Sequence, residues 1–250
     1  MIRTANPALN SKSFENFMSA AGASQMTLQG SVLKTAALLF IAAGCALITW
    51  IPMQNSNFET AIALGFGGMI AGFILGMVTV FKREWAPVTA PIYAACEGLF
   101  LGAISAVYDL RFPGTHIVLN AILLTFGTLF ALLMAYTSRL IKPTENFKLG
   151  VVAATGGIAV AYLVMFFLSM FGVRVGWIHS SGPIGIGISL FVIIVAALNL
   201  VLDFDFIEQG AESGAPKYME WYAAFGLLVT LVWLYLEILR LLAKLQSRRS

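Results

Sequence analysis

Acidic side chains lie within long apolar stretches of this sequence, where ionised groups are costly. Asp203 and Asp205 stand two positions apart in "NLVLDFDFIEQG", directly after a run of apolar residues. Glu97 lies in "YAACEGLFLG", and Glu237 lies in "LYLEILR", three residues before Arg240. Within a bilayer an aspartate costs roughly 2.5 to 3.5 kcal/mol at the centre and less near the interface. Such carboxyl groups can take up a proton, hold a cation or pair with a basic side chain. Their depth in the bilayer decides which of these three states is favoured.

Each acid has a structural and a functional interpretation. Glu97 lies near the middle of its apolar run. It is either a neutral carboxyl group that is hydrogen-bonded to a neighbouring helix or a binding site on an ion or proton path. Asp203 is expected about one turn inside the cytoplasmic end of its helix, and Asp205 points away, about 200° round the helix. Either these aspartates are helix-end acids that face the headgroups, or Asp203 is a gate. Glu237 either pairs with Arg240 at the far interface or lies on the path.

Catalytic signatures are missing from the sequence. It has no HExxH zinc motif and no GxSxG nucleophile elbow. The Gly-x-Gly-Asp pattern of intramembrane aspartyl proteases is also missing. His116 and His179 are expected in loops outside the membrane, and the serines that follow His179 do not form a positioned dyad. We therefore expect a protein that is not an enzyme and needs no cofactor.

The composition places these acids in an integral membrane protein. Hydrophobic residues make up 59% of the chain and charged residues 11%, with a mean hydropathy of +0.87. A soluble domain carries about a quarter charged residues, so lipid must cover most of this surface. The net charge of +3 is spread over short loops, which argues against a nucleic-acid partner. Cys45 and Cys96 lie in apolar runs, without the spacing of a metal site or a disulfide framework.

Seven apolar runs are long enough for spanning helices, which need roughly 20 residues. They cover approximately residues 32–51, 61–81, 87–108, 117–138, 149–172, 183–207 and 221–242. Each run is continuously apolar, which favours helices over strands because backbone groups in lipid must be satisfied internally. The short connections predict one all-α membrane domain, residues 32–243. A polar N-terminal segment, 1–31, precedes it, and a basic tail, 244–250, follows it.

The basic residues of the loops predict the orientation. The loops on one side hold only Arg111 and Arg174. The other side holds Arg3, Lys12, Lys34, Lys82, Arg83, Arg139, Lys142, Lys148 and Lys217. By the positive-inside rule the N-terminus lies in the cytoplasm. Seven crossings then place the basic C-terminal tail outside, and a last helix that enters and returns is the alternative.

Glycines repeat every four residues in two of the runs. Gly68, Gly72 and Gly76 lie on one helix face in "GGMIAGFILG", and Gly98 and Gly102 lie on another in "EGLFLG". Small residues at this spacing let helix backbones approach closely in lipid. We expect these faces to pack inside the bundle, with a seam between copies of the chain as the alternative.

Several of these segments resemble the Bax inhibitor-1 family of membrane proteins. The resemblance covers nearly the whole chain and rests on the seven runs and on "APIYAACEGLFLGAIS", "LDFDFIEQGAESG" and "LYLEILRLL". The segment "RTANPALNSKSFENF" is similar to a bacterial subgroup described as YccA-like. The resemblance implies two three-helix layers around a central last helix, in the cytoplasmic (inner) membrane of a bacterium. It also implies a pH-sensitive calcium leak or, for some members, restraint of cell death or of a membrane-bound protease.

In that family an aspartate near the end of the sixth helix shares a proton or hydrogen bond with an aspartate in the seventh. Aligning on "ESG" places Asp203 at the first position, with Asp205 beside it. The second position falls on Thr230 if Arg240 is the family's basic residue, or on Glu237 if "LYLE" matches the family's "LYLD". Thr230 is about 14 Å deep and Glu237 about 24 Å. We therefore assign the position to Thr230 and expect the paired-acid switch to be altered or absent.

These observations predict a pH-sensitive cation leak channel, with calcium as the transported ion and Asp203 as the gate. Glu97 and Glu237 are expected to offer oxygen ligands along the route, with Arg240 restraining Glu237; no metal site is assigned. The alternative is a non-conducting regulator that binds another membrane protein, such as a protease. Its contacts would come from the N-terminal segment and the loop "EQGAESGAPKYMEW". A proton-coupled transporter of a small solute fits the same acids.

Overall fold

The computed structural model describes residues 25–172 and 180–249. Within these ranges the chain forms one short 3-10 turn, η1 (Arg83–Trp85), and seven long helices. The long helices are α2 (Leu28–Gln54), α3 (Phe58–Phe81), α4 (Ala86–Arg111), α5 (Ile117–Thr137), α6 (Glu145–Met170), α8 (Pro183–Glu212) and α9 (Met219–Arg249). All seven are long and apolar enough to cross a membrane, which confirms the predicted polytopic all-α class. Most of the predicted N-terminal segment, and His179, lie outside the described residues.

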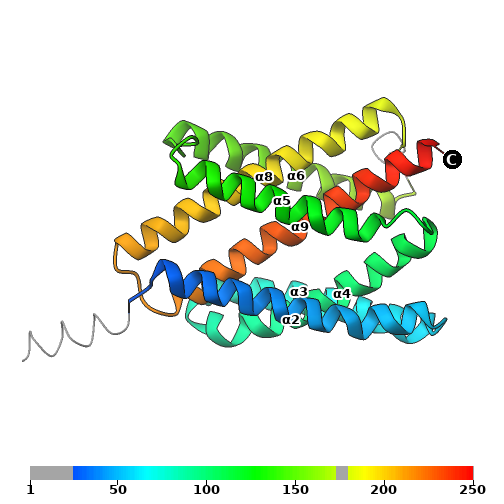
Figure 1. The fold of residues 1–250 in the computed structure, drawn as a ribbon, viewed down its shortest axis with the longest axis horizontal. Coiled ribbons are helices and arrows are strands. Elements are labelled where there is room, and N and C mark those ends of the chain that lie inside the picture. The colour runs from blue at the N-terminus through cyan, green and yellow to red at the C-terminus, as the bar shows by residue number, and fades with distance from the viewer. Residues whose placement is uncertain (1–24, 173–179, 250) are drawn as a thin grey trace, which may run out of the picture.

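The helices form two three-helix layers with α9 between them (Figure 1). In one layer α2, α3 and α4 pack on one another, and in the other α5 and α6 pack on α8. The central helix, coloured orange to red in Figure 1, contacts α2 and α4 on one side and α5 and α8 on the other. This arrangement confirms the architecture that the family resemblance implied.

The last helix runs through the whole bundle without a break. α9 has 31 residues, and its C-terminus lies at the end of the bundle opposite the start of α2 (Figure 1). The alternative of a last helix that enters and returns therefore does not describe it. Lys244 was predicted to lie in the basic tail, but it belongs to α9 and is only 7% exposed. Burial is possible there because the ammonium group finds polar partners on α8.

The sixth long helix is longer than its apolar run predicts. α8 continues to Glu212 because ion pairs with basic residues of other segments neutralise acids in its last turns. Gly214 ends it with a φ of 67°, in the left-handed region that favours glycine after a helix. Asp203 thus lies nine residues before the end of α8, about 14 Å along the axis. The prediction that it lies about one turn from the end is wrong.

The glycine faces lie at contacts between helices of one layer. Three glycines of α3 face α4, and two glycines of α4 face α2: Gly68, Gly72, Gly76, Gly98 and Gly102. A Cβ atom added at Gly68 would come within 2.6 Å of the Cys96 carbonyl oxygen, and one at Gly98 within 2.8 Å of Cys45 Cβ. These positions therefore set the close spacing of α2, α3 and α4, as small residues do in lipid.

Candidate functional site

Asp203 lies in the interior of the bundle, where α8 packs against α9. Its Oδ2 atom is buried and has no hydrogen-bond partner among the described residues. The side chain of Thr230, on α9, lies within interaction distance of the carboxyl group. Thr230 is eleven residues after the start of α9, about 16 Å along its axis. Because the antiparallel helices are joined by the short segment 213–218, the two side chains meet at similar depth.

The two neighbouring acids of α8 have basic partners. Asp205 forms an ion pair with Lys148 of α6, with 2.9 Å between Oδ2 and Nζ. Glu208 forms an ion pair with Arg139, with 2.7 Å between Oε1 and Nη2. Asp203 has no ion pair with any described residue. The stretch therefore contains two neutralised carboxylates and one that is left to a proton or a cation.

Further along α9, Glu237 is part of a closed polar triangle. Its Oε1 atom accepts hydrogen bonds from Arg240 Nη1 at 2.7 Å and from the Tyr162 hydroxyl group at 3.0 Å. Arg240 Nη1 also lies 3.0 Å from the Tyr162 hydroxyl oxygen. The other carboxylate oxygen, Oε2, is buried without a hydrogen-bond partner in the described part of the chain. The triangle links α6 to α9 and restrains Glu237.

The end of α9 beyond this triangle is basic. Lys244 Nζ donates hydrogen bonds to the Gly185 carbonyl oxygen and to Ser189 Oγ, both at 2.9 Å. Lys244, Arg240 and Arg111 line a polar pocket of about 210 Å³. Arg240 is paired with Glu237, so Lys244 and Arg111 give this mouth of the bundle its positive potential.

Glu97 lies in the other layer, away from this line of polar groups. It faces Gly72 of α3, where an added Cβ would be 3.3 Å from Glu97 Oε1, and it hydrogen-bonds to Tyr93 one turn earlier on α4. The glycine face of α4 packs on α2, so the neighbouring Glu97 side chain points toward α3. The structure thus brings Glu237 and Arg240 together, as the sequence indicated, but does not bring Glu97 to them.

The opposite end of α9 is held by a buried carboxylate that joins it to α2. Glu220 is fully buried and forms ion pairs with Lys34 and, at 2.9 Å, with Lys217. Its Oε1 atom accepts hydrogen bonds from the backbone N–H of Thr27 at 2.9 Å and from the Thr27 hydroxyl group at 2.8 Å. The starts of α2 and α9 are therefore locked together by charge.

Polar side chains attach α6 to the rest of its layer. Only Val151 is buried among its residues, yet three side chains spaced seven apart reach α8 or α9. The pairs are Lys148 with Asp205, Thr155 with Asn199 at 2.8 Å, and Tyr162 with Glu237. Apolar burial does not drive helices together in lipid, whereas packing and hydrogen bonds do. These three contacts therefore fix the position of α6.

No individual role was predicted for Tyr162, Glu220 or Lys244 from the sequence. For Tyr162 a signal was available, because Lys148, Thr155 and Tyr162 repeat every seven residues along an otherwise apolar run. A seven-residue repeat keeps side chains on one helix face. Glu220 and Lys244 stand near the ends of their run, where charged residues are ordinary, so their burial has no signal in the sequence.

The two layers around a central helix, with carboxyl groups buried along that helix, define a polytopic membrane protein with an internal line of polar groups. A comparison with protein-family models matches residues 6–247 to the family described as Bax inhibitor 1 like. Since the match covers nearly the whole sequence, this chain belongs to the Bax inhibitor-1-like family. A comparison with curated proteins found no match.

Proposed function

We propose that this protein lets cations, with calcium as the expected ion, leak across the membrane under the control of proton uptake at Asp203. The proposal is supported chiefly by the buried Oδ2 atom of that carboxyl group, which lacks a hydrogen-bond partner among the described residues. Leaving a buried charged oxygen unpaired is costly, so the group either holds a proton or receives a cation. A site that alternates between these two states can couple protons to cation passage.

Thr230 offers a partner for both states of the carboxyl group. Its hydroxyl group donates to the Gly226 carbonyl oxygen at 3.3 Å, which leaves the hydroxyl oxygen free to accept a hydrogen bond from protonated Asp203. After the proton leaves, the hydroxyl group can turn and donate to the carboxylate, releasing Gly226. One hydroxyl group thereby takes the place of a second acid.

The far half of the proposed route is closed in this arrangement. Glu237 is held by Arg240 and Tyr162, and the basic pocket at that end repels cations. Opening therefore requires α9 to move far enough to free Glu237 from Arg240. In the proposed cycle, the exchange of partners between Asp203 and Thr230 starts that movement.

Calcium fits this route as cargo. A calcium ion is held by six to eight oxygen ligands in a strong site, whereas no three His, Cys, Asp or Glu residues gather closely within residues 25–172 and 180–249. Asp203 on α8 and Glu237 on α9 are instead separate single carboxyl groups along the proposed route. Conduction requires sites weak enough for the ion to leave, and single carboxylates meet that requirement.

Calcium flux into protein-containing vesicles, measured on both sides of neutral pH, tests the proposal. Wild type should leak in a pH-dependent manner, and Asp203→Asn should abolish that dependence because the amide cannot exchange a proton. Asp205→Asn is the matched control, since Asp205 pairs with Lys148 and should leave the pH dependence in place. If wild type and both variants leave the vesicles equally tight at every pH, the channel proposal is overturned. The alternative of a non-conducting regulator then predicts one stoichiometric membrane-protein partner, such as a protease, in a pull-down from native membranes.

A further inference from the structure

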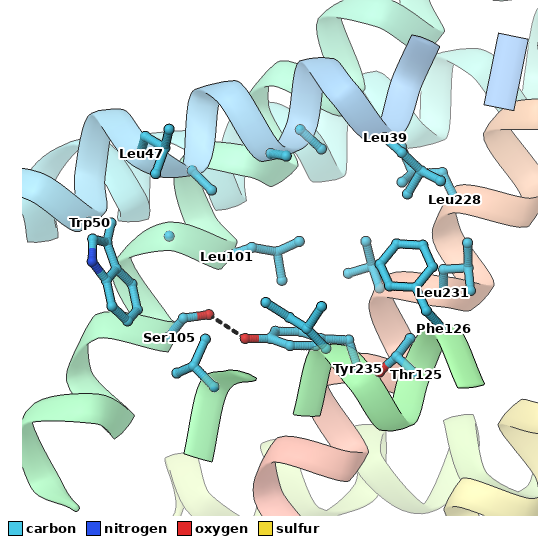
Figure 2. A pocket seen from close by; sticks show the side chains of 17 residues that line it. Leu39, Leu47, Trp50, Leu101, Ser105, Thr125, Phe126, Leu228, Leu231 and Tyr235 are labelled. Atoms are coloured by element: carbon cyan, nitrogen blue, oxygen red, sulfur yellow. Dashed lines mark hydrogen bonds between the residues drawn. The ribbon is translucent and has the colours of Figure 1, made fainter. Parts of the chain in front are cut away.

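A cavity of about 450 Å³ lies between the two layers, walled by α2, α4, α5 and α9 (Figure 2). Its volume is within the usual range of ligand sites, about 300 to 1,000 Å³. Its floor includes Leu228 and Leu231 of α9, which are 1% and 3% exposed. Neither Asp203 nor Glu237 lines it, so the cavity has no part in the proposed cation route.

The hydroxyl groups in the cavity wall are already bonded within the protein. Those of Ser105 and Tyr235 hydrogen-bond to each other at 2.7 Å, as the dashed line in Figure 2 shows. The Thr125 hydroxyl group donates to the Ala121 carbonyl oxygen of its own helix, also at 2.7 Å. Apart from the indole of Trp50, the other lining side chains are hydrocarbon. A buried water needs about two to four polar partners, so this wall favours a hydrocarbon occupant.

The cavity opens sideways, at the depth of the membrane. Leu47 of α2 and Ile122 of α5 line it and are also 55% and 40% exposed on the outer surface of the bundle. Both helices pack on α9 but scarcely on each other. An entrance therefore lies between α2 and α5, where the surroundings of a membrane protein are lipid chains.

The length of the cavity matches one leaflet of a bilayer. Trp50 lies at one end, and Leu39 and Leu228 lie at the other (Figure 2). Leu39 and Trp50 are eleven residues apart on α2, about 16 Å at 1.5 Å per residue. The hydrocarbon core of a bilayer is about 30 Å thick, so this is about half of it. Trp50 stands four residues before the end of α2, where tryptophan is enriched at the headgroup level.

We propose that this cavity binds one hydrocarbon chain of a bilayer phospholipid, which enters between α2 and α5. The chain lies along α2 with its carbonyl end beside Trp50 and its methyl end beside Leu39 and Leu228. The leaflet that supplies it is the one at the end of α2 that carries Gln54. The site is independent of the proposed cation leak, and either can fail without the other.

Photolabelling with phospholipids that carry a diazirine on the acyl chain tests both the site and its direction. The intact protein is reconstituted with a probe labelled at the chain terminus or with one labelled near the carbonyl group, and crosslinked peptides are mapped by mass spectrometry. The terminal probe should label the buried α9 peptide around Leu228, and the proximal probe should label the peptide that contains Trp50. Phe167, 56% exposed on α6, reports ordinary contact with the surrounding lipid.

Two variants distinguish a chain inside the cavity from one on the surface. Ala43 lines the cavity on α2, and Ala43→Trp should lower labelling around Leu228 several-fold by filling the space. Ala159→Trp, on the exposed face of α6, adds the same bulk elsewhere and should leave that labelling unchanged. The proposal is overturned if wild type labels the Phe167 surface but never the buried α9 peptide. It is equally overturned if Ala43→Trp leaves labelling of that peptide at the wild-type level.

Discussion

Asp203 on α8 and Thr230 on α9 face each other at similar depth in the bundle, and the carboxyl group keeps one buried oxygen without a hydrogen-bond partner in the described residues. The pair consists of one acid and one hydroxyl group, so a single proton and a single rotating O–H suffice to change its bonding. A rearrangement at this contact acts directly on the helix around which both layers pack.

Removing the Thr230 hydroxyl group tests this contact. Thr230→Val should destabilise the protein by about 1 to 3 kcal/mol under conditions that ionise Asp203, because the carboxylate then loses its polar neighbour. Under acidic conditions the loss should be smaller, since the neutral group is less costly to bury. Thermal unfolding in detergent at several pH values measures the difference. Thr35→Val is the control, because the Thr35 hydroxyl group donates to the Ser31 carbonyl oxygen of its own helix. A pH-independent loss of stability in Thr230→Val would contradict the pairing of Thr230 with Asp203.

Gly30 on α2 should not tolerate a methyl group. An added Cβ would overlap the carboxylate of Glu220, so Gly30→Ala has to displace a buried, ion-paired side chain. We expect a loss of about 1 to 3 kcal/mol, as for other overpacked positions, and a lower melting temperature. Gly44→Ala on the same helix has nothing within 4 Å of the new atom and should be neutral or stabilising. Equal stability of the two variants would show that the Glu220 cluster can rearrange at little cost.

Tyr162→Phe should loosen α6. The substitution removes the hydroxyl group that contacts both Glu237 and Arg240, and apolar burial cannot replace it on this helix. Spin labels placed on α6 and α9 should show a broader distance distribution than in the otherwise unchanged protein. Ser169→Ala continues the same seven-residue series but removes a bond within α6, to Phe166, and should leave the distribution narrow. A narrow distance distribution in Tyr162→Phe would mean that the contacts of Lys148 and Thr155 are enough to hold α6 in place.

The end of the chain should lie outside the cytoplasm if the N-terminus lies inside. α9 runs unbroken through the bundle, parallel to α2, so the two helices end on the same side. A periplasm-dependent reporter fused after Ser250 should be active, and the same reporter fused within the loop after Phe81 should be inactive. The reverse pattern would overturn the orientation predicted from the basic loops.

Much of the fold could be predicted from the sequence, because lipid imposes a simple requirement on length and polarity. All seven apolar runs correspond to helices, and the layered arrangement followed from the family resemblance. The helix ends were less predictable. The run before Glu208 stops at Ile207, but the helix continues because Arg139, distant in sequence, neutralises that acid. Partners from other segments decide whether a charge ends a helix, and a single sequence does not reveal them.

The candidate site could be predicted only in part. Thr230 was placed opposite Asp203 by alignment, and the Glu237–Arg240 pair followed from helical spacing. The direction of Glu97 could not be predicted, because it depends on which face of α4 packs on α2. The cavity beside Tyr235 could not be predicted either, because it forms only where α2, α4, α5 and the central α9 leave a space between them.

The central position of α9 also constrains how the protein is made. Proteins are synthesised from the N-terminus, so α2 to α8 reach the bilayer before the helix that occupies the middle of the bundle. Four ionisable side chains of that helix find partners on earlier helices or on α9 itself: Glu220, Glu237, Arg240 and Lys244. Until translation ends, the two layers contact each other mainly through α4 with α5 and α2 with α8. A chain that stops before Met219 therefore lacks the helix that contacts both layers, and Lys34 and Tyr162 are left without their α9 partners. We expect such a chain to be a substrate for quality-control proteases.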